Sequence, residues 1–385
     1  MIPITKPWMD EREAEAARRP ILAGWITQGP EVAAFEREFA EYVGAPHACA
    51  VSNCTTALHL ALIAAGIGSG SEVITVSHSF IATANAIRYC GATPVFVDIA
   101  PGTFNIDASL VAAAVTPRTR AVLCVHQIGM PCDLGTLVEI CRRHKLFLIE
   151  DAACAIGSEI LDDCRWERIG RPHGDVACFS FHPRKVISTG DGGMITTRHS
   201  EWDAKFRLLR QHGMSVPDII RHGASTVVCE SYPSVGYNYR LTDIQAAVGR
   251  EQLIRLPQIV NRRRELAANY ARLLAGICEL GIPVEPRWAR SNWQSYAVRL
   301  PKHCDQIQTM QFLLDGGIAT RRGIMCSHRE PAYQHHPWRA GSPLCESEAA
   351  QDKALLLPLY PQMTFLDQEQ VVERLQAAIS KQHSS

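Results

Sequence analysis

The stretch Ser180-Phe-His-Pro-Arg-Lys185-Val-Ile-Ser-Thr-Gly-Asp-Gly-Gly-Met-Ile-Thr-Thr197 joins two apolar runs through a turn rich in glycine. The runs at 176–181 and 193–197 are typical of buried strands. A lysine between a buried strand and such a turn can be held in a dry, fixed position that favours the neutral amine, as imine formation requires. Taken alone, Lys185 is explained much better as a solvated surface lysine, because ammonium groups are mostly exposed. The rest of the chain therefore decides between the two interpretations.

Outward from this stretch, residues 47–200 alternate short apolar runs with helical patterns, which predicts an α/β fold with a mainly parallel sheet. Helices are expected over 55–65 and 134–144, where apolar residues recur three and four apart. Ligands gather at the carboxyl ends of strands in such sheets. Three expected strands end in the polar groups Ser52-Asn53, His78-Ser79-Phe80 and Glu150-Asp151. The seven expected strands are 48–52, 72–76, 94–98, 121–126, 147–150, 176–181 and 193–197.

A second, smaller C-terminal α/β domain is expected after a long helix that begins near Thr242-Asp243. We place the large domain at 12–250 and the small domain at 251–385. In the small domain the pattern predicts a strand over 295–300 and helices over 306–314 and 367–379. The extra residues 161–172 are expected to form a hairpin, and the irregular stretches 216–233 and 326–341 are candidate substrate loops.

Composition excludes several classes of function. The 385-residue chain has 39 basic and 39 acidic residues, so its charge gives no reason to expect nucleic acid or an anionic membrane as a partner. Its 14 cysteines form no CxxC pair, and a chain of this length needs no disulfide scaffold. No signal sequence or membrane span is evident. We expect a cytoplasmic protein that acts on a small molecule, with no metal site.

Four further features have both a chemical and a plain structural explanation. Asp151 follows an apolar strand, so its carboxylate can pair with a protonated ring nitrogen, or it can simply cap a helix. Thr55 and Thr56 lie where a strand gives way to a helix, a place that suits both anion binding and ordinary capping. Ser180 is a second hydroxyl candidate for the same anion. Phe80 can stack on an aromatic ring or belong to the core.

Together these stretches resemble the DegT/StrS-type (DegT/DnrJ/EryC/StrS) sugar aminotransferases, which are pyridoxal-phosphate enzymes of fold type I. The resemblance runs in family order over nearly the whole chain. Each motif alone is weak evidence for the family, but the whole set in this order is specific evidence for it. The matching stretches are Gly24-Trp-Ile-Thr-Gln-Gly-Pro30, Ser52 to Leu60, Ser79-Phe-Ile-Ala-Thr83, His126-Gln-Ile-Gly129, Glu150-Asp-Ala-Ala153, Ser180-Phe-His-Pro-Arg-Lys185 with Gly190-Asp-Gly-Gly193, Gly236-Tyr-Asn-Tyr-Arg-Leu-Thr-Asp243, and Gly317-Ile-Ala-Thr-Arg321.

The resemblance implies a role for each matching residue. Lys185 corresponds to the lysine that forms the Schiff base, and Asp151 to the partner of the pyridine nitrogen. His182 is expected to act in catalysis and to line the substrate pocket. The remaining implied roles are ring stacking for Phe80, phosphate binding for Thr55, Thr56 and Ser180, contact with the neighbouring subunit's cofactor for Asn238, and substrate binding for Trp25, Thr27 and Arg321.

Two cysteines depart from the family pattern at positions that are expected to contact the cofactor. Cys154 stands where the family usually has Gln or His after Asp-Ala-Ala, and Cys54 replaces a common glycine. A thiol can still pack against the ring or donate weakly. We therefore expect the two cysteines to change the reactivity of the bound cofactor and not to prevent its binding.

The implied reaction transfers an amino group from glutamate or glutamine to a keto sugar, most readily a nucleotide-linked 4-keto-6-deoxy sugar. A homodimer with shared active sites is implied as well. A relative with histidine at the lysine position dehydrates deoxysugars, so Lys185 favours amino transfer. The acceptor can also be a cyclitol ketone or a non-nucleotide keto-sugar acid, and a non-catalytic sensor can keep the same fold.

Overall fold

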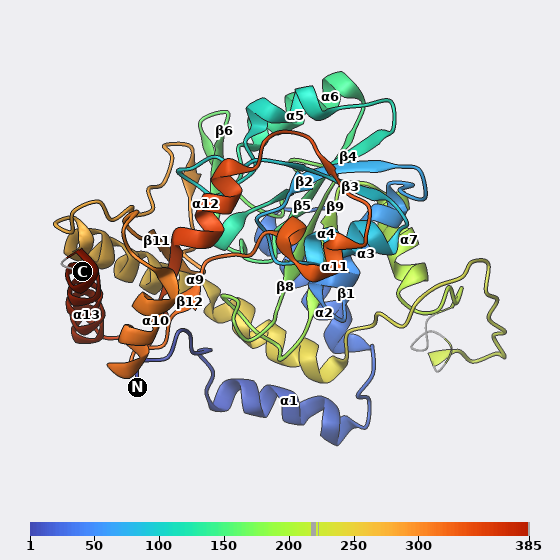
Figure 1. Ribbon diagram of the computed structural model, residues 1–385. Helices are drawn as coiled ribbons and strands as arrows, with labels where there is room; N and C mark the ends of the chain where they lie inside the picture. Colours follow the sequence, from blue (N-terminus) through green and yellow to red (C-terminus); the bar gives the residue numbers. More distant parts are fainter. Residues whose placement is uncertain (217–220, 222, 384–385) are drawn as a thin grey trace.

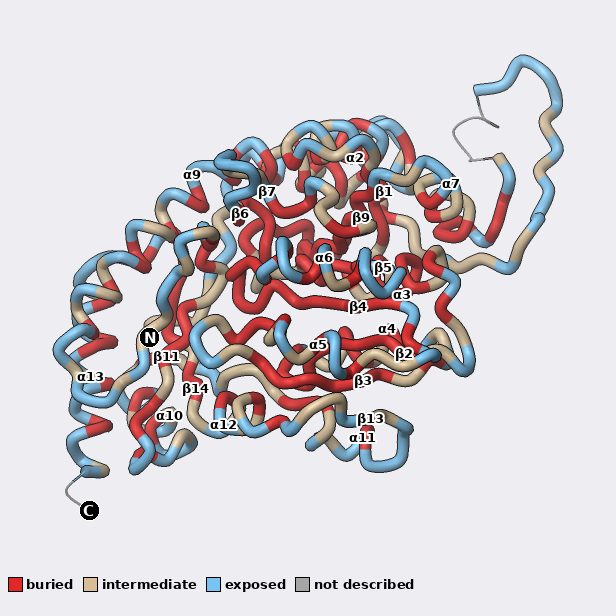
Figure 2. The backbone as a smooth tube through the Cα atoms, turned by 90° about the horizontal axis from the view of Figure 1, so that it is seen from above, coloured by how far each residue is buried: buried red, intermediate tan, exposed pale blue. Residues whose placement is uncertain are grey.

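The computed structural model describes residues 1–216, 221 and 223–383, and an eight-stranded sheet forms its centre (Figure 1). All seven strands expected from the sequence are present in it. The strands of the middle of the sheet are buried almost throughout (Figure 2). In sheet order they are β1 (His47–Val51), β9 (Gly193–Thr197), β8 (Val176–Ser180), β5 (Phe147–Asp151), β4 (Thr119–Val125), β2 (Glu72–Val76), β3 (Thr93–Val97) and β13 (Arg339–Ala340).

The sheet is mainly parallel, as expected. The pairs from β8 across to β13 run parallel, whereas β9 is antiparallel to both β1 and β8. The eighth strand, β13, is an addition to the expected seven. It comes from the C-terminal third of the chain and pairs with β3 over two residues. A strand of two residues produces no alternation of polar and apolar residues that a sequence pattern could reveal.

Helices cover the sheet and connect its strands. The helix expected at 134–144 has the same bounds in the structure, and the one expected at 55–65 begins one residue earlier because Asn53 caps it. The helices are α1 (Glu11–Ala23), α2 (Pro30–Val43), α3 (Cys54–Ala64), α4 (Ala82–Tyr89), α5 (Ala108–Ala114), α6 (Leu134–His144), α7 (Ser200–Leu209), α9 (Asp243–Leu274), α10 (Gln306–Asp315), α11 (Pro331–Gln334), α12 (Cys345–Lys353) and α13 (Phe365–His383).

The C-terminal part of the chain has a hydrophobic core of its own. Its sheet consists of β11 (Tyr296–Arg299), β14 (Ala354–Leu357) and β12 (Arg321–Arg322) in that order, all antiparallel. Helices α10 and α13 lie beside this sheet, next to the end of α9 (Figure 1). The long helix α9 serves both cores, with Leu256 in the first and Tyr270 in the second. The boundary at residue 250 stays a prediction.

The expected hairpin is present between Asp151 and Lys185. Strands β6 (Glu159–Asp162) and β7 (Arg165–Arg168) pair antiparallel, and β10 (Ala289–Arg290) extends this small sheet. Within the described part of the chain, no helix combines the length and the apolar character that crossing a bilayer requires.

Candidate active site

Lys185 lies in a tight turn that follows β8. The Lys185 backbone N–H donates to the His182 carbonyl at 2.8 Å, and this turn directs the lysine side chain into a cavity of about 600 Å³. The Lys185 Nζ donates to the Cys154 Sγ at 3.1 Å. The amine is therefore held at a fixed point of the cavity wall by the cysteine that departs from the family pattern.

The surroundings of Lys185 act on its charge in opposite directions. Burial lowers the pKa of the amine, but the Cys154 sulfur and the Asp151 carboxylate outweigh it, so the pKa is raised above its usual value. Our expectation that this position favours the neutral amine is therefore wrong for the chain without a ligand. Burial acts as expected, and the neighbouring sulfur and carboxylate reverse the result.

Asp151 ends β5 and is only 5% exposed. Its Oδ2 accepts from the Thr83 hydroxyl at 2.8 Å, and its Oδ1 accepts from the Ala153 N–H at 3.2 Å. Burial still raises the pKa of this carboxyl group, because these donors compensate only part of the lost hydration. Such a carboxylate gains strongly from a cationic partner, as a protonated ring nitrogen would be.

Thr83 is a functional candidate that sequence reasoning missed. Thr83 is 1% exposed, and its hydroxyl also shares a hydrogen bond of 2.8 Å with the Ser79 hydroxyl. The only signal in the sequence was the pair of hydroxyl residues that flank Phe80. Nothing in that spacing indicates that Thr83 reaches a carboxylate 68 residues further along the chain.

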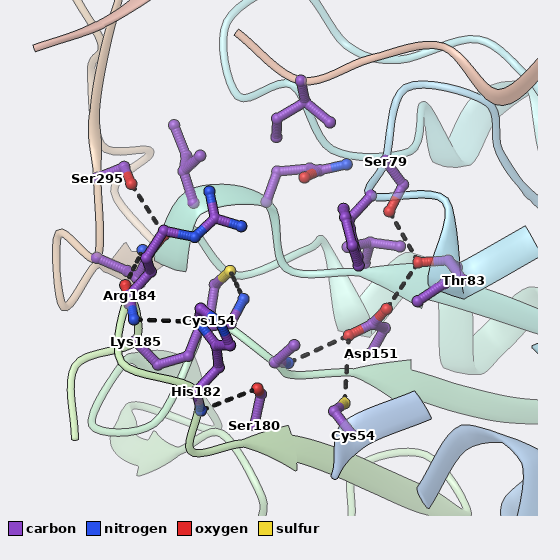
Figure 3. A pocket seen from close by; sticks show the side chains of 18 of the residues that line it. Cys54, Ser79, Thr83, Asp151, Cys154, Ser180, His182, Arg184, Lys185 and Ser295 are labelled. Carbon is purple, nitrogen blue, oxygen red and sulfur yellow. Dashed lines mark hydrogen bonds between the residues drawn. The ribbon is translucent and has the colours of Figure 1, made fainter. Parts of the chain in front are cut away.

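The two key groups face the cavity from different walls. Figure 3 shows Lys185, His182 and Ser180 on one side, with Asp151, Thr83 and Cys54 on the other. Glu150, the neighbour of Asp151, points away from the cavity, as strand alternation predicts, and bonds with the His126 ring at 3.1 Å. The carboxyl ends of three strands thus meet at one site, because Asn53, Ser79 and Asp151 all line it.

The N-terminus of α3 forms a cradle for an anion at one end of the cavity. Asn53 caps the helix by accepting from the Thr56 N–H at 2.9 Å, while the Thr56 hydroxyl donates to the Asn53 carbonyl at 2.7 Å. Thr55, Thr56 and Ser180 all line the cavity, and the Ser180 hydroxyl accepts from the His182 N–H at 3.4 Å. A side chain at Gly193 would clash with Asn53, since an added Cβ would lie 2.5 Å from its carbonyl carbon. Glycine therefore lets β9 approach the cradle closely.

Other predicted residues divide into two groups. Phe80, His182, Cys54 and Arg321 line the cavity, and Phe80 is 63% exposed. His182 accepts from the Arg184 N–H at 3.2 Å through its Nδ1, and burial together with Arg184 lowers its pKa.

Trp25, Thr27 and Asn238 do not line this chain's own cavity, as far as the described residues show. The Trp25 indole N–H donates to the Gln28 carbonyl at 3.2 Å, and the Thr27 carbonyl accepts from the Asp243 N–H at 3.1 Å. Asn238 is exposed and pairs through its backbone with Gln211. The candidate loop 326–341 does not line the cavity either, and part of the loop 216–233 lies outside the described residues.

Arg184 is a second lining residue that sequence reasoning left without a role. Its backbone is fixed at both ends, because its N–H donates to His182 and its carbonyl accepts from the Gln294 amide at 2.7 Å. Its guanidinium has no carboxylate partner among the described residues. No sequence pattern indicates this, since pairing of a side chain depends on the distant segments that the fold brings near it.

Comparison with known proteins identifies the family. The sequence model of the DegT/DnrJ/EryC1/StrS aminotransferase family matches residues 7–376. The chain belongs to this family. It is 40% identical over 381 residues to the GDP-perosamine synthase of Caulobacter vibrioides, covering 97% of each protein. It is 36% identical over 376 residues to the spore coat polysaccharide biosynthesis protein SpsC of Bacillus subtilis, covering 97% of this chain and 95% of SpsC.

Solved structures of the family agree with the fold. The aminotransferase TlmJ from Streptoalloteichus hindustanus is similar with a TM-score of 0.89 and 34% identity, over 99% of both chains. DesV from S. venezuelae, solved with a ketimine intermediate, is similar with a TM-score of 0.87 and 34% identity, over 98% of both chains. The chain is thus a sugar aminotransferase of fold type I, and its family implies pyridoxal phosphate as cofactor.

Proposed function

We propose that this protein transfers an amino group from glutamate or glutamine to the ketone of a nucleotide-linked keto sugar, with a 4-keto-6-deoxy sugar as the acceptor. The observation that carries the proposal is the placement of Lys185 and Asp151 on different walls of one cavity. An amine and a buried carboxylate in this arrangement match the aldehyde and the ring nitrogen of pyridoxal phosphate. The product is an amino sugar for a polysaccharide or a secondary metabolite.

The residues present fit this cofactor. The anion cradle at the start of α3 suits its phosphate through Thr55 and Ser180, and Asp151 suits its ring nitrogen. Phe80, exposed at the cavity, offers a face on which the ring can stack. When bound, the cofactor supplies an electron sink that stabilises negative charge at the substrate carbon.

Side chains of the protein then transfer the α-proton of the amino donor. Lys185 is the one amine that lines the cavity among the described residues, so we assign to its Nζ the removal of the donor's α-proton. Asp151 keeps the ring nitrogen protonated because a buried carboxylate is stabilised by a cation beside it. His182, whose pKa is lowered, is a neutral neighbour that can accept or donate a hydrogen bond at the substrate.

The charge of the cavity supports an anionic acceptor. Cationic side chains outnumber carboxylates along its wall, and a nucleotide-linked sugar brings a diphosphate. The GDP-perosamine synthase that resembles this chain is named for a product of that class. The charged lining residues are Arg184, Lys185, Arg321 and Arg322 against Asp151 and Asp191.

A second copy of the chain completes the site in this proposal. Residues 223–235 extend away from the rest of the molecule and expose Val227 (93%) and Val235 (89%) to solvent (Figures 1 and 2). Asn238 follows this segment and is exposed as well. The exposed segment 223–235, followed by the side-chain amide of Asn238, is suited to contact the cofactor phosphate of a partner subunit. We also infer a reducing, cytoplasmic setting, since all 14 cysteines are free.

The test is the visible absorbance of the purified protein with pyridoxal phosphate, before and after glutamate is added. We expect a band from the bound cofactor that glutamate bleaches and a keto sugar restores. The Lys185→Ala variant should show neither the band nor turnover. A Lys185→Ala variant with wild-type turnover would exclude the proposed role, and a band that no amino donor changes would favour a sensor.

A further inference from the structure

We propose that Arg184 binds the α-carboxylate of the amino donor, whereas Arg321 binds the anionic group of the sugar acceptor. The proposal rests on the proposed function and adds to it that each of the two arginines binds a different substrate. One cavity must accept two substrates in turn, and each of them carries negative charge at a different distance from its reacting carbon.

The chemistry of the substrates sets these distances. In an α-amino acid, the carboxylate is attached directly to the carbon that loses its proton. In a nucleotide-linked 4-keto sugar, the diphosphate is attached across the sugar ring from the ketone carbon. A cation close to the proton-accepting amine therefore suits the donor, and a cation further away suits the acceptor.

We assign Arg184 to the near position because it is the chain neighbour of Lys185 and lies beside it at the cavity (Figure 3). It precedes Lys185 in the tight turn after β8 and lines the same cavity. It is close enough to the neighbouring imidazole to help lower the pKa of His182. Because hydrogen bonds from His182 and Gln294 hold its backbone and not its guanidinium, the side chain stays available to a ligand.

Arg321 occupies a different wall. It belongs to β12, which pairs with β14 in the C-terminal sheet, so another part of the fold carries it. It is exposed at the cavity, and no carboxylate lies within ion-pair distance of it in the described chain. The next residue, Arg322, differs because Glu330 lies 3.5 Å from its guanidinium.

A planar guanidinium is the group best suited to both ligands. It binds carboxylate and phosphate oxygens through two parallel N–H bonds, whereas an ammonium acts as a point charge. An unpaired guanidinium in a partly buried cavity also keeps its hydrogen bonds for the ligand. The two unpaired arginines therefore match the two anions that the reaction brings to this site.

The experiment measures the two half-reactions separately by absorbance in Arg184→Gln, Arg184→Lys and Arg321→Gln proteins loaded with cofactor. For Arg184→Gln we expect the glutamate concentration at half-maximal rate to rise about 10- to 100-fold, with the acceptor half-reaction changed less than about twofold. Arg184→Lys should lie between Arg184→Gln and wild type. Arg321→Gln should show the reverse pattern.

Binding without turnover gives a second measurement. A 2-methylglutamate probe carries the carboxylate but has no α-proton, so its effect on the absorbance band reports affinity alone. Weaker binding to Arg184→Gln, with wild-type binding to Arg321→Gln, is the expected result. The exposed Arg142→Gln on α6 is a matched control that lies outside the cavity lining.

Three outcomes would overturn the proposal. Unchanged glutamate dependence in Arg184→Gln would exclude the donor role, and a defect confined to the acceptor half-reaction would assign Arg184 to the sugar. Equal defects in both half-reactions would show that the two arginines do not bind different substrates. Failure of the wild-type protein to react with any amino donor would instead count against the proposed function itself.

Discussion

At the scale of single residues, the site depends on how two charges are held. Lys185 contacts the Cys154 sulfur at 3.1 Å, and Asp151 accepts from Thr83 at 2.8 Å. Neither Cys154 nor Thr83 is a reactive group in the proposed reaction. Each sets the protonation of the residue it touches, so its removal should change a pH profile before it changes the fold.

Cys154 should control how readily Lys185 takes up the cofactor. The Cys154 sulfur helps to raise the pKa of Lys185, which disfavours the neutral amine that uptake of the cofactor requires. Cys154→Ala removes this contribution, so the lysine pKa should fall and the pH profile of cofactor uptake should shift to lower pH. The measurement is the rate at which the cofactor band appears at each pH. An unchanged profile would contradict this account, and Cys154→Gln should stay active.

Thr83 should keep Asp151 ionised. Without its hydroxyl the pKa of the buried carboxyl rises further, so the acid limb of activity should move to higher pH and turnover should fall about tenfold. Thr83→Val tests this, with Thr83→Ser as the control that keeps the hydroxyl. An acid limb in Thr83→Val at the wild-type pH would show that the hydrogen bond has no such effect. Asp151→Asn should retain the cofactor and lose activity.

At the scale of elements, the first turn of helix α9 is bonded to the start of helix α2. Asp243, at its first turn, is 1% exposed, and its carboxylate accepts from the backbone N–H groups of Gly29, Glu31 and Val32 at 2.8, 3.2 and 3.0 Å. These are the free N–H groups at the start of α2, whose own cap residue Gly29 has no side chain to satisfy them. One aspartate therefore caps a helix 214 residues away in the sequence.

Loss of this carboxylate should destabilise the fold. Asp243→Ala leaves buried N–H groups unsatisfied and should lower the free energy of unfolding by about 2–4 kcal/mol. Asp243→Asn keeps one acceptor oxygen and should cost less. Urea unfolding followed by circular dichroism measures both variants. An Asp243→Ala protein that unfolds at the wild-type urea concentration would show that water replaces the carboxylate without cost.

The elements also show how far the sequence alone could lead. The carboxyl ends of β1, β2 and β5 were expected to carry the site, and the helix α9 was expected to begin near Thr242-Asp243, where the structure shows that Thr242 and Gln245 cap it. Strand β13 could not be predicted, since its two residues have no periodicity. The contacts of Thr83 and the unpaired state of Arg184 were also beyond prediction, because they depend on packing between distant segments.

At the scale of the whole molecule, the proposed dimer accounts for the position of Asn238 outside this chain's cavity. We expect sedimentation to give twice the 42.5 kDa mass of one chain. The exposed amide of Asn238 then contributes to the partner's site. A monomer that is fully active would contradict the shared-site proposal.

Subunit mixing tests the shared site directly. Lys185→Ala and Asn238→Asp should each be inactive or weak alone, but a mixed dimer contains one intact site. Random exchange should restore about a quarter of wild-type activity, since half of the dimers are mixed and each has one good site of two. Tagged subunits confirm the exchange. No recovery despite exchange would place Asn238 outside the partner's site.

The most direct test of the central claim is reduction of the protein loaded with pyridoxal phosphate by borohydride, followed by peptide mapping with mass spectrometry. Reduction fixes the cofactor covalently to the amine that holds it. We predict a single modified residue, Lys185, in a peptide that also contains the Ser180-Phe-His-Pro-Arg184 sequence when cleavage leaves it joined. A modification at any other lysine, or none at all, would contradict the account.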